Sequence, residues 1–430
     1  MALPQAKTDG AEDLLARHAA PLAGAKWADE ARSAAAARLR NMGAPVRRDE
    51  YWKFTNPVLL TDANKPETPV LDTQESPVFE DVDALRLTFV DGVFDPEQSD
   101  VMALDGVEIE PLGEALATDI HWAKEVFGVL ETRGQTPVPR PLAALNTAVA
   151  AAGVAIRVSG QATRPVSIRY VHANPHSDAV VHHAIKVEQG AAFTLLESGA
   201  GAARFNGCIE AEVADGAAFH HVRSQGRDHE RKVVTHLFAR LGTQSTLKSF
   251  TLSVNGVMTR NEAVVEFTGD DAAAHVAGAA AGDGAFHHDD TVFVTHDAVN
   301  CESRQVFKKV LRNGAVGVFQ GKILVKADAQ KTDGYQISQG LMLDDDSQFL
   351  AKPELEIYAD DVACSHGSTV GSVDEDALFY LTSRGVPREA AEGMLVLAFL
   401  DESIQEIEDE ALGNMIRKRL ADWIERHRTA

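Results

Sequence analysis

The sequence predicts a mainly β protein with a β-solenoid at its centre, and two observations support that fold class. Over residues 142–370, short runs of apolar and β-branched residues alternate with Gly, Asp and Asn, which is the pattern of strands joined by turns. Within this region, residues 187–193 (VEQGAAF) and 213–219 (VADGAAF) are near copies of each other. An internal repeat of this kind indicates a stacked architecture.

The repeat keeps an almost constant length. Gly190, Gly216, Gly242 and Gly269 follow one another at intervals of 26, 26 and 27 residues. A unit of this length that is rich in strand formers leaves no room for a helix, so we expect each unit to form one coil of a solenoid. A β-sandwich made of meanders also gives regular turn signals, but near-identical repeats at a fixed period favour the solenoid.

Helical segments are expected before the solenoid. Residues 11–42 are rich in Ala, the best helix former, and predict one or two helices that end near Gly43. A proline-containing loop over residues 57–77, a strand pair over 85–93 and a helix over 120–130 are expected to follow.

After Gly371 the sequence becomes helical again. Residues 372–375 (SVDE) form a capping box, which predicts a helix N-terminus. One apolar stripe in the tail, more typical of intramolecular core than of a partner groove, comprises Leu412, Ile416, Leu420, Trp423 and Ile424. We therefore expect an N-terminal helical and mixed region over residues 1–140, a β-helix core over 141–370 and a C-terminal helical domain over 371–430.

The composition argues against several classes of function. The 430 residues carry a net charge of −23, which disfavours nucleic acids and anionic membrane surfaces as partners because both are negatively charged. The cysteines, Cys208, Cys301 and Cys364, lie too far apart for a disulfide framework or a zinc-finger spacing, which indicates a reducing compartment. The N-terminus resembles no signal peptide, and no stretch approaches ~18 apolar residues. We expect a cytoplasmic protein.

Cys364 and His366 form the candidate functional site. In an extended backbone, residues two positions apart point to the same face, so both side chains are able to meet one metal ion. A thiolate and an imidazole both suit iron or zinc. Spacing alone favours a half-buried Cys and a surface His without such a role, since a free Cys is usually a small buried hydrophobe.

Other cysteines and histidines carry weaker hypotheses. Counted from the repeat glycines, His182 and Cys208 hold equivalent positions in successive coils, close enough to share a ligand. Polar residues commonly stack in solenoids, so a structural role is favoured for both. Cys301 is expected to be a buried thiol.

Two further patterns are expected to be structural. The acidic groups at residues 289–290, 344–346 and 360–361 predict solvated turns. Residues 317–323 (GVFQGKI) resemble a phosphate-binding loop, but the glycine spacing is one residue short and Ile323 replaces the required Ser or Thr. We expect a strand turn there, with an exposed Lys322.

Longer motifs are shared with a known family. They are residues 49–55 (DEYWKFT), 329–336 (AQKTDGYQ), 352–361 (KPELEIYADD), 364–367 (CSHG) and 378–385 (LFYLTSRG). In this order they resemble the motifs of the SufB/SufD family of iron–sulfur cluster assembly proteins, and they extend over most of the chain. The central histidine of CSHG and the aromatic motif at 49–55 are similar to the SufD branch. Gly334 and Ala363 depart from the usual residues.

The resemblance implies a right-handed parallel β-helix and a scaffold subunit without catalytic activity. It implies assembly with a SufB-like paralogue and two SufC-like ATPase subunits, with a nascent iron–sulfur cluster or its iron at the interface with SufB. His366 is then the main ligand and Cys364 an auxiliary or structural neighbour. SufB supplies the other ligands, because two ligands cannot complete a four-coordinate sphere. A reduced flavin is associated with the family's complex, but no residues here identify such a site.

The resemblance further implies that the helical tail docks the SufC-like ATPase. The approximate docking region comprises Leu378, Phe379, Leu381, Leu395 and Phe399. No convincing nucleotide-binding motif occurs in this chain, so ATP hydrolysis is expected in the partner.

Two other functions stay open at this point. A homodimeric metal-binding carrier would use the same Cys364 and His366, and a surface that meets SufB is also able to meet a second copy of this chain in isolation. A carbohydrate-active β-solenoid enzyme is the other alternative. The missing secretion signal, the modest 6% of aromatic residues and the CSHG motif argue against it.

Overall fold

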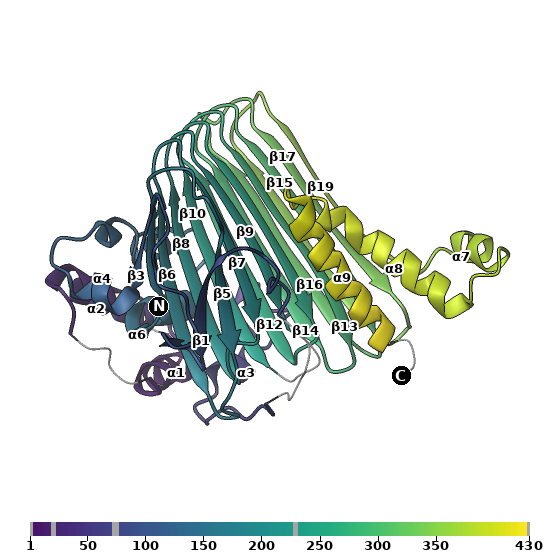
Figure 1. Ribbon diagram of the computed structural model, residues 1–430, viewed down its shortest axis with the longest axis horizontal. Coiled ribbons are helices and arrows are strands. Elements are labelled where there is room, and N and C mark those ends of the chain that lie inside the picture. The colour runs from purple at the N-terminus through teal and green to yellow at the C-terminus, as the bar shows by residue number, and fades with distance from the viewer. Residues whose placement is uncertain (1–2, 19–22, 71–76, 227–230, 428–430) are drawn as a thin grey trace.

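Parallel strands stack into two long sheets that lie face to face, as the computed structural model shows (Figure 1). It describes residues 3–18, 23–70, 77–226 and 231–427. Sheet A has the order β2–β1–β5–β7–β9–β11–β13–β15–β17–β19, and sheet B the order β3–β4–β6–β8–β10–β12–β14–β16–β18. From β4 onward the chain alternates between the sheets. This is the predicted parallel β-solenoid, and the meander sandwich is excluded.

The strand bounds follow the repeat. Sheet A comprises β1 (Leu85–Val90), β2 (Val93–Asp95), β5 (Val166–Val171), β7 (Ala192–Gly199), β9 (Ala218–Gln225), β11 (Thr246–Val254), β13 (Ala273–Asp283), β15 (Glu302–Arg312), β17 (Asp333–Met342) and β19 (Ala363–Gly371). Sheet B comprises β3 (Val107–Pro111), β4 (Val154–Val158), β6 (Asp178–Val187), β8 (Arg204–Val213), β10 (Lys232–Leu241), β12 (Met258–Phe267), β14 (His287–His296), β16 (Val316–Val325) and β18 (Gln348–Ile357).

The near-identical repeats stack directly on each other. Gly190 and Gly216 adopt left-handed turns with φ of 70° and 65°, and the Gly190 N–H donates to the Asp215 carbonyl at 2.9 Å. The strands that follow are in register, so Phe193 pairs with Phe219 and their rings stack with centroids 5.9 Å apart. Side chains at alternate strand positions therefore form ladders along the interior.

N-terminal helices cover the outer face of sheet B. They are α1 (Gln5–Ala16), α2 (Lys26–Met42), η1 (Glu50–Trp52), α3 (Val58–Thr61), α4 (Leu112–Ala117), η2 (Trp122–Glu125), α5 (Val129–Arg133) and α6 (Pro141–Val149). The expected helix end at Gly43 and the strand pair over residues 85–93 are confirmed. The short α3 interrupts the segment expected as a loop, and residues 71–76 of that segment lie outside the described residues.

The single helix expected over residues 120–130 is wrong. The chain forms η2 and α5 instead, separated by Gly128 in the left-handed region with φ of 73°. The cause is distant in sequence: the carboxylate of Glu210 on β8 accepts the N–H groups of Gly128 and Glu131 at 2.5 and 2.6 Å.

C-terminal helices cover part of the outer face of sheet A. They are α7 (Glu375–Thr382), α8 (Arg388–Ile404) and α9 (Glu410–Arg426). The helices α8 and α9 pack on the sheet, whereas α7 projects away from it (Figure 1). The predicted stripe of α9 is core, with Leu412, Ile416, Leu420 and Trp423 buried. The cap of α7 is Asp374 rather than Ser372, because its carboxylate accepts the N–H groups of Asp376 and Ala377.

Buried histidines make the interior sensitive to acid. The Nε2 of His183 lies 2.8 Å from the Tyr170 hydroxyl, which donates to Glu197 at 2.6 Å, and Nδ1 accepts the Val154 N–H at 3.2 Å. Burial lowers the pKa of His183 to about 4 from the ordinary 6.5. The folded chain therefore binds fewer protons than the unfolded chain between these two pH values.

We predict that His183→Gln flattens the fall in stability with acid. Wild-type stability holds above about pH 6.5 and decreases toward pH 4, with His183 contributing up to ~1.4 kcal/mol per pH unit, because the unfolded chain gains the proton first. Urea unfolding midpoints at several pH values measure this slope. His176→Gln, at an exposed position, is the control that keeps the wild-type slope. Equal slopes for His183→Gln and wild type would refute the assignment.

Candidate functional site

Cys364 and His366 lie on β19, the last strand of sheet A. Their register partners on β17 are Gly334 and Gln336, which face the solenoid interior. As residues two apart on a strand, Cys364 and His366 share this face. Cys364 is half-buried and His366 is exposed. Burial raises the pKa of the Cys364 thiol, which disfavours the thiolate.

Gly334 makes room for the thiol. A Cβ at this position would lie 3.1 Å from Sγ of Cys364 and 3.4 Å from the Ile323 side chain. Cys364 packs at the edge of a small apolar cluster that contains Ile323, Val325 and Ala329. The lack of a side chain at Gly334 therefore leaves the space into which the Cys364 thiol packs.

Gln336 places a buried acceptor beside His366. Its Nε2 donates to Gln305 Oε1 at 2.8 Å, and both glutamines are fully buried. Within the described part of the chain, Oε1 of Gln336 has no hydrogen-bond partner. Gln336 and His366 are register partners on neighbouring parallel strands, so they lie side by side on the same face of the sheet.

The solenoid ends openly at this point. β18 and β19 each pair with one neighbouring strand, so each leaves one edge of backbone groups unpaired. Val370 is 60% exposed although its register partners in earlier coils face the interior, since no further coil covers it. Exposed apolar groups at Ile357 and Tyr358 continue this end surface on β18 and just after it.

The two candidates do not complete a metal site by themselves. Across residues 3–18, 23–70, 77–226 and 231–427, no group of three or more His, Cys, Asp or Glu side chains is arranged to hold a metal ion. An imidazole and a thiol at an open solenoid end offer two ligands to iron and leave the remaining positions to another molecule.

The other cysteine and histidine candidates are structural. His182 and Cys208 are register partners, as predicted, but both are buried beneath α5 and α6. The ring nitrogens of His182 lie 2.9 Å from Asn146 and 2.9 Å from Glu210. Cys301 is a buried thiol, as predicted, and donates weakly to the Gly269 carbonyl at 3.4 Å.

Two structural expectations were wrong. Residues 317–323 lie inside β16 rather than at a turn, and Lys322 is largely buried, with its ammonium 2.5 Å from Glu356. Asp289 and Asp290 are buried in β14 and are not solvated. The acidic groups at 344–346 and 360–361 lie in turns with exposed members, as predicted.

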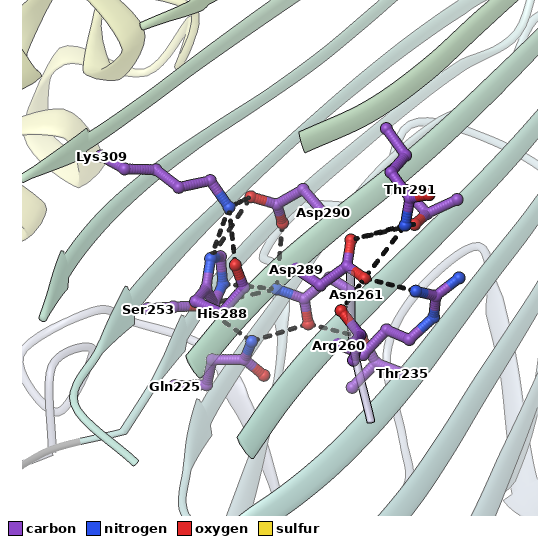
Figure 2. A network of polar contacts seen from close by, with 12 residues as sticks. Gln225, Thr235, Ser253, Arg260, Asn261, His288, Asp289, Asp290, Thr291 and Lys309 are labelled. Carbon is purple, nitrogen blue, oxygen red and sulfur yellow. Dashed lines mark hydrogen bonds and ion pairs between the residues drawn. The ribbon is translucent and has the colours of Figure 1, made fainter. Parts of the chain in front are cut away.

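A buried polar network occupies the middle of the solenoid, and the sequence did not lead us to expect it. Figure 2 shows Lys309 with its ammonium 2.7 Å from Asp290 and 2.8 Å from Nδ1 of His288. Asn261 lies 3.2 Å from the other His288 nitrogen and accepts from Gln225 at 2.7 Å. The sequence did contain a signal for this network, because the polar residues His288 and Asp290 stand two apart and therefore point to the same face of β14. That this face points inward follows only once the register of the solenoid is known.

Burial controls the ionisation of this network. It lowers the pKa of His288 well below its ordinary range, with the Lys309 charge adding to the effect. Burial also lowers the pKa of Lys309, against which Asp290 acts. On the outer face of the same sheet, Asp289 pairs with Arg260, whose guanidinium lies 4.2 Å from the ring centre of Trp52. The aromatic motif of residues 49–55 thus anchors the N-terminal region to sheet B.

The expected docking residues of the tail differ in exposure. Phe379 is 73% exposed on α7, whereas Leu378 next to it is buried. Leu381, Leu395 and Phe399 are half-buried. No helix within the described ranges is long and apolar enough to cross a membrane.

Comparison with known proteins agrees with the fold and with the motifs. The model of the family "SUF system FeS cluster assembly, SufBD core domain" matches residues 170–399, more than half of the chain. The iron-sulfur cluster assembly protein SufD of Escherichia coli (strain K12) is 26% identical over 408 residues, covering 89% of this chain and 90% of that protein.

Two more relatives align over similar lengths. SufD of Bacillus subtilis (strain 168) is 26% identical over 391 residues, covering 87% of each chain. A SufBD family protein of Synechocystis is 26% identical over 422 residues, covering 90% of this chain and 89% of that protein. On the motifs, the solenoid and the match to the family model, this chain belongs to the SufB/SufD family of the SUF system, which assembles iron–sulfur clusters.

Proposed function

We propose that this chain is a non-catalytic, SufD-like scaffold subunit of an ATP-driven complex. In this proposal it pairs with a SufB-like chain at the open solenoid end and docks a SufC-like ATPase through its tail. The regions 1–140, 141–370 and 371–430 serve as its N-terminal region, rigid core and docking domain. The observation that carries the proposal is the placement of His366 on the last, open strand of the solenoid.

The open end favours a partner with the same architecture. The free edges of β18 and β19 present backbone donors and acceptors that another strand is able to pair with. The exposed side chains of Ile357, Tyr358 and Val370 add apolar area around these edges. A second solenoid end meets both requirements, and a homologous chain supplies one. A second copy of this chain meets them less specifically, which is how a homodimer arises in isolation.

His366 is the stronger ligand of the pair. Its imidazole is exposed and free to approach iron, whereas burial raises the pKa of the half-buried Cys364 thiol. A neutral imidazole binds iron without losing a proton, but a thiol must first ionise. We therefore assign His366 as the ligand to the nascent cluster, which is the cargo of the complex, and Cys364 as an auxiliary neighbour.

The C-terminal helices connect the docking surface to the core. Phe379, Tyr380 and Met394 are exposed apolar groups on α7 and α8. Further along, Glu402 pairs with Lys308 of β15, and Glu406 accepts from Arg304 at 2.7 Å and lies 2.9 Å from His275. A partner bound at α7 thus pulls on a helix that is fastened to sheet A.

We predict that His366→Ala lowers cluster loading at least about tenfold in the complex purified without oxygen, because it removes a ligand to the cluster. Iron and acid-labile sulfide per complex are the measured quantities. Cys364→Ser should lower cluster loading by less than His366→Ala does. Ser365→Ala, on the opposite face of β19, should leave cluster loading unchanged. Full loading of the His366→Ala complex with intact partners would refute the assignment.

Gln336→Leu should weaken iron retention by roughly tenfold while the partners still co-purify. In this proposal the buried amide oxygen, which has no described partner, accepts the free ring N–H of His366 on the paired strand and fixes the nitrogen that faces iron. Outer partners in such a role typically contribute 10- to 100-fold. Gln336→Glu keeps an acceptor and should restore retention. Gln339→Leu, on the other face of β17, is the matched control. Unchanged retention in Gln336→Leu would leave Gln336 a packing residue.

Phe379→Ser should weaken ATPase binding more than tenfold, because burying a Phe side chain typically contributes ~1.5–3 kcal/mol. Titration of the purified ATPase against the chain measures the dissociation constant. The substitution leaves stability intact, since the ring is 73% exposed. Val93→Ser, similarly exposed on β2 at the other end of the molecule, is the control. Equal affinities for wild type and Phe379→Ser would move the docking surface elsewhere.

A further inference from the structure

Arg231, just before β10, is a buried cation that lacks a partner among the residues that the structure describes. Its side chain has 0% exposure. All three of its guanidinium nitrogens lack a hydrogen-bond partner in the part of the chain that the structure describes. Leaving such a group unsatisfied in the interior costs several kcal/mol. Even though burial lowers its pKa to about 9, the guanidinium stays charged at neutral pH.

The other buried arginines differ in this respect. Arg223 donates to Glu197 at 2.5 and 2.8 Å, and Arg260 pairs with both Glu262 and Asp289. In both cases a carboxylate lies beside the guanidinium and balances its charge. Arg231 has no described carboxylate in this position, so its charge calls for a counter-ion of another kind.

Arg231 borders a small cavity of about 20 Å³ in the solenoid interior. Among its lining residues, Glu197 is neutralised by Arg223 and held by Tyr170 at 2.6 Å and by His221 at 2.7 Å. Among the described residues of the lining, Arg231 is therefore the one charge that is left unbalanced. The cavity carries a net positive charge and attracts an anion.

The backbone around Arg231 is shaped to admit its side chain. Gly226 and Gly256 have φ of 87° and 107°. A Cβ at Gly226 would lie 2.1 Å from Nη1 of Arg231, and one at Gly256 would lie 3.3 Å from its Cγ. The hydroxyl of Thr259, also next to Gly256, is a second buried polar group without a described partner.

Two polar residues of the cavity lining belong to the network in Figure 2. Gln225 and Thr235 line the cavity and both donate to Asn261, at 2.7 and 2.8 Å. Asn261 in turn leads to His288 and Lys309. Polar groups that are already held in place thus form part of the cavity lining beside Arg231, as expected of a preformed site.

We propose that this cavity binds a small inorganic anion, which pairs with Arg231 and completes the interior of the solenoid. The cavity of about 20 Å³ suits one water-sized ion, such as a halide or a hydrosulfide, and it excludes a nucleotide. The proposal concerns an internal site and is independent of His366 and of the partner chains.

The test uses the full chain. At constant ionic strength, the melting temperature is measured while bromide replaces gluconate, a bulkier anion. Above the dissociation constant, wild type should gain about 1–2 °C for each tenfold rise in bromide relative to Arg231→Met, because the anion binds only the folded state. Arg169→Met, which removes an exposed guanidinium, should behave as wild type and cancels general salt effects. A hydrosulfide series then identifies which of the two anions binds more tightly.

A second measurement does not depend on the variants folding. Anomalous diffraction from crystals grown in bromide should place an ion beside the guanidinium of Arg231. The sequence next to it contains Asp228 and Glu230, outside the described residues. The double variant Asp228→Asn with Glu230→Gln should keep both the bromide response and the bound ion. An empty cavity, a bromide response that persists in Arg231→Met, or a wild type without a response would overturn the proposal.

Discussion

The hydrogen bonding of each coil to the next is the constraint on which the rest of this structure depends. Each parallel strand satisfies its backbone only through the same sheet position in the neighbouring coils, so the strand register must hold from coil to coil while the turns take up differences in repeat length. At the N-terminal end, the short antiparallel strands β2 and β3 and the nearby helices blunt the free edges. At the C-terminal end, β18 and β19 stay open. The N-terminal end of the solenoid therefore has covered strand edges, whereas the C-terminal end offers unpaired strand edges to another molecule.

Stacking also decides which polar residues the interior tolerates. A polar side chain on one coil lies about 4.8 Å from its register partners, so each must find its hydrogen bonds among them or across the interior. Across the two sheets, the Lys309 ammonium finds hydrogen-bond partners in His288 and Asp290. Gln305 accepts one hydrogen bond from Gln336. The guanidinium of Arg231 finds no such partner among the described residues, and the proposed anion supplies its acceptor and counter-charge. The chain as a whole carries a net charge of −23, so this internal site has the opposite sign to the protein that surrounds it.

The sequence was sufficient for the solenoid because its evidence is local and repeated. Gly190 and Gly216 mark equivalent turns, and their following strands carry the same pattern. The sequence was insufficient where a residue far away along the chain determines the local structure or the burial of a side chain. Glu210 breaks the helix expected over 120–130, and Arg260 and Lys309 turn Asp289 and Asp290 from expected turn residues into buried ones. The motif placed His366 at a junction, but only the register shows that Gln336 lies beside it.

In the proposed complex, the solenoid connects a partner at α7 mechanically to the open end that carries β19. A solenoid with every interior strand paired on both sides moves as one body, and α8 is fastened to β13 and β15 of that body. Force applied to α7, which projects from the sheets, is therefore transmitted to the whole core rather than absorbed by a hinge within it (Figure 1). The open end that carries His366 must follow the same movement. A nucleotide-driven partner at α7 would thus be able to open or close the interface at His366 without contacting the cluster.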